Sequence, residues 1–379
     1  MLRPAVLEMR DIPFGRPWIT DAEREAVADV LRRDTLTHGP ECAAFEREFS
    51  DFVGEGAYSV ATSSCMAALH LACVHFGIGP GDEVIVPAQT HTATAHAVEW
   101  VGARPVFVDC DRLTGNVTAQ GIAAAVTART KAIMLVHFLG VPCDMPAILA
   151  VAERHGLRVI EDCALALGAR IDGRHVGLLG DTGCFSFYPV KHMTTGEGGM
   201  FVSRDREAAA AVRAMRAFGV ERSSGYDVPT LGLNYRMSEI SAALGRVQLR
   251  RLSEGLRRRA ENFAALREGL LAIGKLAVLG TSDPALRSSH YCLVAVLDGE
   301  AAPRNDVLAR LKALGVGTSV YYPQPVPRLS YYRRKYGYEA ARYPEAERIS
   351  DRGFALPTGW HLCPSDVNYI VKAVEEAAA

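Results

Sequence analysis

Short apolar runs alternate with stretches of helical periodicity between about residues 58 and 202. The runs are rich in β-branched and aromatic residues, which predicts strands. Strands that alternate with helices favour a mainly parallel sheet wrapped by helices, and therefore an α/β fold. The predicted strands are Tyr58–Thr62, Glu83–Val86, Pro105–Val108, Ala132–Val136, Arg158–Ile160, Gly183–Phe187 and Met200–Val202.

The pattern changes after about Ser238, where one long helix is predicted to continue through Leu266. Beyond it the sequence predicts two strands around a helix, and then a closing helix. We expect a large domain over residues 1–255 and a smaller α+β domain over residues 256–379. The predicted elements of the second domain are strands at His290–Val296 and Gly317–Tyr321 and helices at Asn305–Leu314 and Ser365–Ala378.

A lysine lies between the last predicted strands of the large domain. Phe185 and Phe187 alternate with Ser186, as in a half-buried strand, and Gly198-Gly199 predicts a tight turn before the next apolar run. A lysine that is held and desolvated can act as a nucleophile near neutral pH. Lys191 is therefore the candidate nucleophile. The alternative is a surface lysine beside an ordinary hairpin turn.

An acid closes the predicted strand at 158–160. Parallel strands deliver such side chains to the carboxyl edge of a sheet, where ligands bind. Neighbouring strand residues point to opposite faces, so Asp162 is favoured over Glu161 as the residue of the site. The protonated ring nitrogen of pyridoxal phosphate is a suitable cationic partner for a buried aspartate. The alternative is a carboxylate that caps the next helix.

A third candidate group opens a predicted helix over Ala67–Cys73. Helix N-termini bind phosphate through free backbone N–H groups, and nearby hydroxyls add donors. Ser64, Cys65 and Met66 are placed to hold a cofactor phosphate in this way. Plain N-capping by serine is the alternative.

Five segments together resemble the DegT/DnrJ/EryC1/StrS family, in order and at ordinary spacing from about Phe14 to the C-terminus. That family comprises fold type I aminotransferases that use pyridoxal phosphate and act mostly on nucleotide-linked keto sugars. The resemblance implies a seven-stranded sheet in the large domain. The segments are Ser64–Leu69, Gly81–Pro87, Glu161–Ala164, Phe185–Gly199 and Leu233–Glu239.

The resemblance implies a role for each matching residue. Lys191 would bind the cofactor covalently and Asp162 would pair with its ring nitrogen, while Ser186 and the backbone at Ser64 and Cys65 would hold its phosphate. His91 falls where relatives stack a ring on the cofactor, although from the sequence alone it also reads as a helix cap.

Two further residues imply a shared site. In relatives Asn234 reaches the phosphate in the neighbouring subunit, and Arg236 meets the carboxylate of the amino donor, so we expect a homodimer. The segment Ser319–Pro327 resembles a loop that approaches the sugar, with Tyr321 and then Arg328 as candidate substrate residues. An exposed arginine after a rigid turn is the alternative for Arg328.

Two departures from the family pattern stand out. Met66 replaces a threonine whose hydroxyl bonds the phosphate, and methionine cannot donate. Leu165 replaces a polar residue near the phenolic oxygen of the cofactor. Dehydratases of the family carry histidine at the lysine position, so Lys191 favours transfer of an amino group, from glutamate or glutamine to a nucleotide-linked keto sugar. A keto-cyclitol substrate and a dehydratase or eliminase reaction are the alternatives.

Composition and charge limit the partners and the compartment that we expect for this protein. The 379 residues carry a formal net charge of −1, which gives no reason to expect nucleic acid or an anionic membrane as partner. No apolar run is long enough to cross a bilayer, and the N-terminus lacks the apolar core of a secretory signal. The nine cysteines show no zinc-type spacing and are expected to be reduced thiols in a cytoplasmic enzyme without a metal. His137 is expected to be a satisfied core histidine, and His192 has no assigned role.

Overall fold

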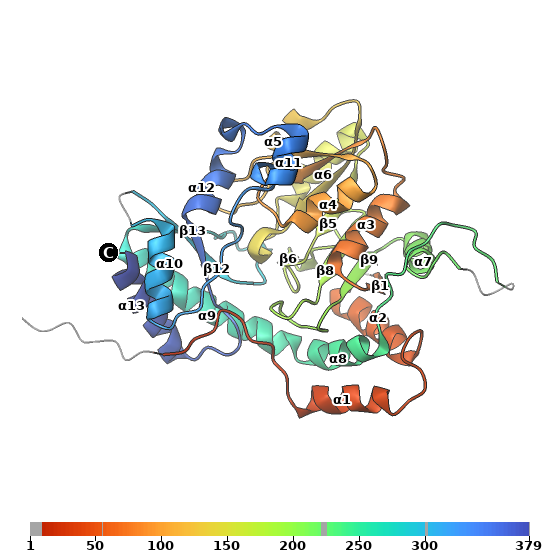
Figure 1. Ribbon diagram of the computed structural model, residues 1–379, viewed down its shortest axis with the longest axis horizontal. Coiled ribbons are helices and arrows are strands. Elements are labelled where there is room, and N and C mark those ends of the chain that lie inside the picture. The colour runs from red at the N-terminus through yellow and green to blue at the C-terminus, as the bar shows by residue number, and fades with distance from the viewer. Residues whose placement is uncertain (1–9, 55, 221–225, 300–301, 379) are drawn as a thin grey trace, which may run out of the picture.

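The computed structural model describes residues 10–54, 56–220, 226–299 and 302–378, and it is built around a seven-stranded sheet (Figure 1). The strand order is β1-β9-β8-β5-β4-β2-β3; the two pairings that involve β9 are antiparallel and the other four are parallel. The expected mainly parallel sheet is therefore confirmed. Its strands are β1 (Tyr58–Thr62), β2 (Glu83–Pro87), β3 (Arg104–Val108), β4 (Thr130–Val136), β5 (Arg158–Asp162), β8 (Thr182–Ser186) and β9 (Gly199–Ser203).

Helices cover both faces of this sheet because strand side chains alternate between two apolar cores. In β2, for example, Val84 and Val86 lie in one core and Ile85 lies in the other. The first core includes α3 (Cys65–His75), α4 (Thr92–Trp100) and α7 (Arg206–Met215). The second includes α2 (Pro40–Val53), α5 (Ala119–Ala125) and α6 (Met145–His155).

The single long helix predicted after Ser238 is wrong at one residue. The chain forms α8 (Glu239–Arg250) and α9 (Leu252–Ile273), and Arg251 between them has φ −108° and ψ 5°. Its guanidinium carbon lies 4.8 Å from the ring centroid of Trp18, in the segment that leads into α1 (Asp21–Leu31). The apolar periodicity runs through this break, so the sequence pattern does not reveal it.

A second sheet has the order β10-β12-β13 and packs with α9, α10 and α13 on the far side of the molecule from α7 (Figure 1). Its strands are β10 (Leu276–Val278), β12 (Leu293–Leu297) and β13 (Gly353–Leu356), and its other helices are α10 (Arg304–Ala313) and α13 (Pro364–Ala378). The predicted domain boundary at 255/256 falls inside the continuous helix α9 and stays a prediction.

The predicted strand at Gly317–Tyr321 is also wrong. Only Ser319 pairs with the second sheet, through an isolated bridge to Ala355. Gly317 instead donates its N–H to the carbonyl of Ile12 at 2.7 Å, which ties this segment to the N-terminal chain. The remaining elements are β6 (Arg170–Ile171), β7 (Arg174–His175), β11 (Leu286–Arg287), η1 (Phe138–Gly140), η2 (Val326–Arg328), α11 (Ser330–Tyr336), η3 (Ala340–Arg342) and α12 (Pro344–Arg352).

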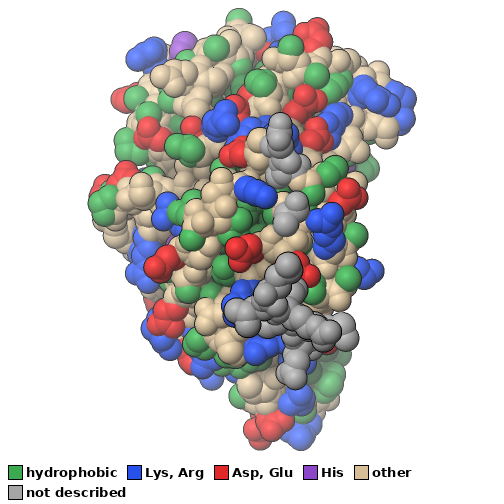
Figure 2. Space-filling view, turned by 90° about the vertical axis from the view of Figure 1, so that its left-hand side faces the viewer, with side chains coloured by type: hydrophobic (Ala, Val, Ile, Leu, Met, Phe, Trp, Pro, Cys, Tyr) green, Lys and Arg blue, Asp and Glu red, His purple; other side chains and the backbone are tan. Residues whose placement is uncertain are grey.

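Among the described residues, charges of both signs are interspersed on the face that carries α10 and α13 (Figure 2). This distribution agrees with the near-neutral net charge. In the described part of the chain, none of the helices has the length and apolar character needed to span a membrane.

Candidate active site

Lys191 lies in the loop that follows β8. Phe185 and Phe187 are buried against Phe49 of α2, while Ser186 between them points to the opposite side, as the alternation predicts. The Lys191 N–H donates to the carbonyl of Tyr188 at 2.9 Å. Its Nζ atom lies 5.0 Å from the ring centroid of Tyr291, and burial lowers the pKa of the amine from its ordinary value.

The glycines after Lys191 have other roles than the tight turn that the sequence predicts. Only Gly196 has the left-handed backbone of a turn residue, with φ +79°. A Cβ on Gly199 would lie 2.3 Å from the carbonyl carbon of Ser64, so glycine is needed here for close packing of β9 against the start of α3. Gly199 therefore shapes the site, and the prediction that Gly198-Gly199 makes the turn is wrong.

The two carboxylates at the end of β5 point to opposite faces, as predicted. Glu161 accepts a hydrogen bond from His137 Nε2 at 2.8 Å, and three backbone N–H groups also donate to it, from Gly177, Leu179 and Gly180. Burial raises the pKa of Glu161, but these hydrogen bonds and the adjacent imidazole outweigh burial and lower it. His137 is thus the satisfied core histidine that was expected.

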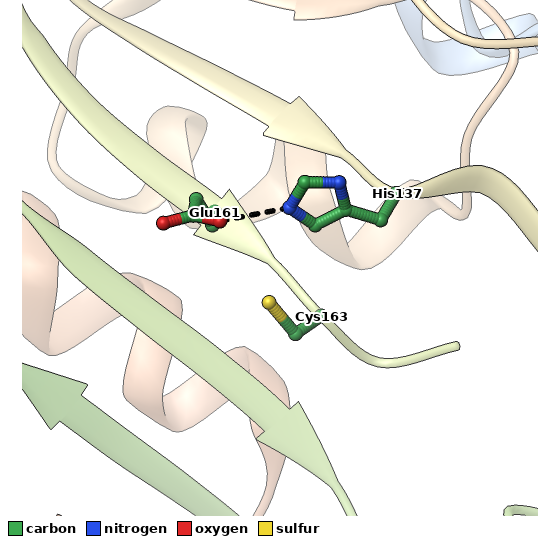
Figure 3. A group of neighbouring side chains, drawn as sticks. All are labelled: His137, Glu161 and Cys163. Atoms are coloured by element: carbon green, nitrogen blue, oxygen red, sulfur yellow. Dashed lines mark hydrogen bonds and ion pairs between the residues drawn. The ribbon is translucent and has the colours of Figure 1, made fainter. Parts of the chain in front are cut away.

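Cys163 lies beside this pair, so the three side chains offer atoms close enough to hold a metal (Figure 3). The hydrogen bonds argue against that role. His137 Nδ1 accepts from the Cys143 N–H at 3.0 Å, so Nε2 carries the proton and faces Glu161. Burial also raises the pKa of the Cys163 thiol well above its ordinary value. We interpret the group as a hydrogen-bonded part of the core.

Asp162 faces the other side of the sheet and is 4% exposed. It accepts hydrogen bonds from Thr94 Oγ1 at 2.9 Å and from the Ala164 N–H at 3.0 Å. Within the described residues it has no ion-pair partner. A buried carboxylate of this kind is complementary to a cationic ligand atom.

The N-terminus of α3 adds a potential anion site. Ser64 is the N-cap, and its Oγ accepts from the Ala67 N–H at 3.1 Å, so the proposed capping role is present. The hydroxyl proton of Ser64 is then available to a ligand. Cys65 and Met66 follow as the first helical residues, whose N–H groups the helix leaves without internal partners.

One pocket of about 450 Å³ joins these groups. The predicted site residues that line it are Ser64, Cys65, Met66, His91, Asp162, Leu165, Ser186, Lys191 and Tyr321. Other lining residues escaped the sequence analysis, among them Thr90, Tyr188, Tyr291, Tyr322 and Glu197. The three tyrosines at 291, 321 and 322 come from the second half of the chain, and only the fold reveals that they face Lys191.

Three predicted residues do not line this pocket. Arg328 forms an ion pair with Asp351 at 2.5 Å. Arg236 donates to Asn234 Oδ1 at 3.0 Å and lies 2.8 Å from His38 Nε2. Any role of these residues at a site therefore stays a prediction.

Two histidines near Lys191, at positions 91 and 192, have different surroundings. His91 caps α4 by accepting from the Ala93 N–H at 3.1 Å and also lines the pocket, while its stacking on the cofactor stays a prediction. Burial lowers its pKa, so a neutral ring is favoured there. The His192 ring packs against Tyr291, and its Nε2 lies 3.2 Å from the carbonyl oxygen of Ser289.

The pocket suits pyridoxal phosphate on three independent observations. Asp162 is a buried carboxylate complementary to the protonated ring nitrogen, and Lys191 is an amine with a lowered pKa for attachment to the carbonyl carbon. The start of α3, with its N-cap Ser64, offers donors for the phosphate. Close packing by Gly199 keeps β9 against that helix start.

The DegT/DnrJ/EryC1/StrS aminotransferase family model matches residues 17–375 of this chain. The spore coat polysaccharide biosynthesis protein SpsC of Bacillus subtilis is 37% identical over 96% of each chain. The GDP-perosamine synthase of Caulobacter vibrioides is also 37% identical, over 97% of this chain and 99% of its own length.

Solved structures agree with this assignment. Spr1654 of Streptococcus pneumoniae, described as a sugar aminotransferase, has been solved in forms with pyridoxal phosphate and with pyridoxamine phosphate. Both structures superpose on this chain with a TM-score of 0.92 at 30% identity. The match covers 97% of this chain and 98–99% of theirs. A 3-amino-5-hydroxybenzoic acid synthase gives a TM-score of 0.91 at 32% identity, over 98% of this chain and 99% of its own. The fold is therefore fold type I, and the chain belongs to the DegT/DnrJ/EryC1/StrS family of aminotransferases, with pyridoxal phosphate as its cofactor.

Proposed function

We propose that this aminotransferase moves an amino group from L-glutamate, or from glutamine, to a nucleotide-linked keto sugar and so forms an amino-deoxy sugar. The observation that carries the proposal is that Lys191 and Asp162 face one pocket together with the start of α3. The likeness to a GDP-perosamine synthase over almost the whole chain supports a sugar nucleotide as acceptor.

Pyridoxal phosphate, when bound, supplies a carbonyl carbon for amines and a ring that accepts electrons from the adjacent carbon. Lys191 would hold the cofactor through its side-chain amine and, as a free amine, would accept the proton from the α-carbon of the donor and give it back. Because burial lowers its pKa, a larger share of its amine is neutral near neutral pH and able to accept that proton. Asp162 would pair with the ring nitrogen of the cofactor.

The phosphate would be held by backbone N–H groups at Cys65 and Met66 and by the hydroxyls of Ser64 and Ser186. His91 would cover one face of the cofactor ring, because it lines the pocket from the start of α4. Leu165 also lines the pocket and is 1% exposed, so it would present an apolar surface to the cofactor.

The amino donor and the sugar nucleotide are anions, and yet no arginine is among the described residues that line the pocket. This supports a homodimer in which Asn234 and Arg236 of each subunit complete the site of the other. Phe218 and Leu231, which lie near Arg236 in the chain, are 47% and 87% exposed, as expected for residues that a second subunit covers.

A hybrid dimer tests the shared site. Lys191→Ala and Asn234→Ala should each lower activity strongly when pure, and co-expression of the two chains should restore it. In the hybrid, one site combines an intact Lys191 from one subunit with an intact Asn234 from the other. If Asn234 acted within its own subunit, the hybrid would stay as inactive as the pure variants.

The acceptor is tested after loading the enzyme with an amino group from L-glutamate. Adding nucleotide-linked keto sugars one at a time should restore the spectrum of the lysine-linked cofactor and yield an amino sugar. The same assay with keto-cyclitols tests the first alternative. Elimination is the second alternative. Sugar turnover without any amino donor would support it.

A further inference from the structure

Two buried threonines stand in line behind the carboxylate of Asp162. Thr94 Oγ1 lies 2.9 Å from Asp162 Oδ2, and Thr90 Oγ1 lies 2.7 Å from Thr94 Oγ1. Thr94 is 0% exposed and Thr90 is 2% exposed. Both come from the junction of β2 and α4, so a rigid part of the fold sets their positions.

The chemistry of the groups fixes the direction of these hydrogen bonds. An ionised carboxylate only accepts, so Thr94 gives its single hydroxyl proton to Asp162. Thr94 Oγ1 must then accept from the Thr90 hydroxyl. Hydrogen bonds joined in this way polarise one another, which makes the Thr94 hydroxyl a better donor.

The other carboxylate oxygen is held separately. Asp162 Oδ1 accepts from the Ala164 N–H at 3.0 Å, and Cys65 Sγ lies 3.9 Å away. The Ala164 contact belongs to the backbone and survives most substitutions. The Thr94 contact depends on a side chain and can be removed by an isosteric change.

We propose that Thr94, supported by Thr90, is a positioning residue that keeps the Asp162 carboxylate turned toward the ring nitrogen of pyridoxal phosphate, so that the proton between these two groups stays on that nitrogen. Each donor to a carboxylate stabilises its charged form and so lowers its affinity for a proton. Removal of the Thr94 hydroxyl shifts that proton toward Asp162 and weakens the attraction of the ring for electrons. This role depends on the cofactor and not on the identity of the sugar.

The test uses full-length protein loaded with pyridoxal phosphate that carries nitrogen-15 in its ring. In Thr94→Val the chemical shift of the ring nitrogen should move toward the value of unprotonated pyridine. The dissociation constant of the cofactor should rise by a factor on the order of ten. Thr94→Ser keeps the hydroxyl and should give the wild-type signal. Thermal unfolding of each loaded variant shows whether it is folded.

Thr90→Val provides a second reading if Thr94→Val fails to fold. It leaves the Thr94 to Asp162 contact in place but removes the donor behind it, so a smaller shift in the same direction is expected. A wild-type signal in both valine variants, a shift in the opposite direction, or an equal shift in Thr94→Val and Thr94→Ser would overturn the proposal.

Discussion

Met66 offers a test of where the cofactor phosphate lies. It lines the pocket at the second position of α3, where the family resemblance leads us to expect a threonine hydroxyl. We predict that Met66→Thr adds one charge-assisted hydrogen bond to the phosphate and tightens cofactor binding by up to about tenfold. Fluorescence titration of the cofactor-free protein measures this. Met66→Leu, which adds no donor, is the matched control, and equal affinities in Met66→Thr and Met66→Leu would argue against a phosphate at this position.

Residue types and their alternation select Lys191 and Asp162, and the structure brings both to one pocket. The sequence distinguishes Asp162 from Glu161 because strand neighbours face opposite sides, and the structure confirms it. Thr94 was missed, although its spacing of four from Thr90 places both hydroxyls on one side of a helix start. Tyr291 was missed for a different reason, since its ring meets Lys191 only through tertiary packing.

Gly199 brings two elements, β9 and α3, into close contact at the end of the pocket where α3 begins. We predict that Gly199→Ala lowers the free energy of unfolding by about 1–3 kcal/mol, because its Cβ overlaps backbone atoms that cannot move aside easily. It should also weaken cofactor binding by displacing the start of α3. Urea unfolding and cofactor titration measure the two effects.

Gly255→Ala is the matched control for this substitution. Gly255 lies in α9, and a Cβ there would meet nothing within 4 Å. Alanine favours helix over glycine by up to about 1 kcal/mol, so this variant should be as stable as the wild type or more so. Equal stability of Gly199→Ala and Gly255→Ala would contradict the packing role given to Gly199.

The sequence predicts well which helices and strands exist, but it does not predict where a long helix breaks or how the segment at Gly317 pairs. The strands of the main sheet carry continuous apolar runs because both of their faces are buried. The break at Arg251 depends on Trp18, far away in the chain, and the pairing of Gly317 with Ile12 depends on the N-terminal segment. Neither contact leaves a local pattern that a sequence reading can use.

At the scale of the whole molecule, buried histidines couple stability to pH. His175 is fully buried; burial lowers its pKa to about 4, and its Nε2 accepts from the Gly168 N–H at 2.9 Å. Between pH 4 and its ordinary pKa of 6.5 the unfolded chain binds the proton more readily, so stability rises with pH across this window and is complete above it.

We therefore predict that the free energy of unfolding falls as the pH drops from 6.5 toward 4, with a contribution from His175 on the order of 3 kcal/mol. Urea unfolding at several pH values gives the slope, and His175→Gln should reduce it. His155→Gln, at the exposed end of α6, is the control. An unchanged slope in His175→Gln would refute this source of the pH dependence.

The most direct test of the proposed reaction is the first half of the exchange, followed by absorbance in the loaded enzyme. Adding L-glutamate, or glutamine if glutamate is inactive, should convert the lysine-linked cofactor to its pyridoxamine form and release one oxo-acid for each site. Lys191→Ala should show neither the starting band nor the conversion. If the wild type holds the cofactor but neither donor converts it, amino transfer from these donors is contradicted and elimination becomes the better account.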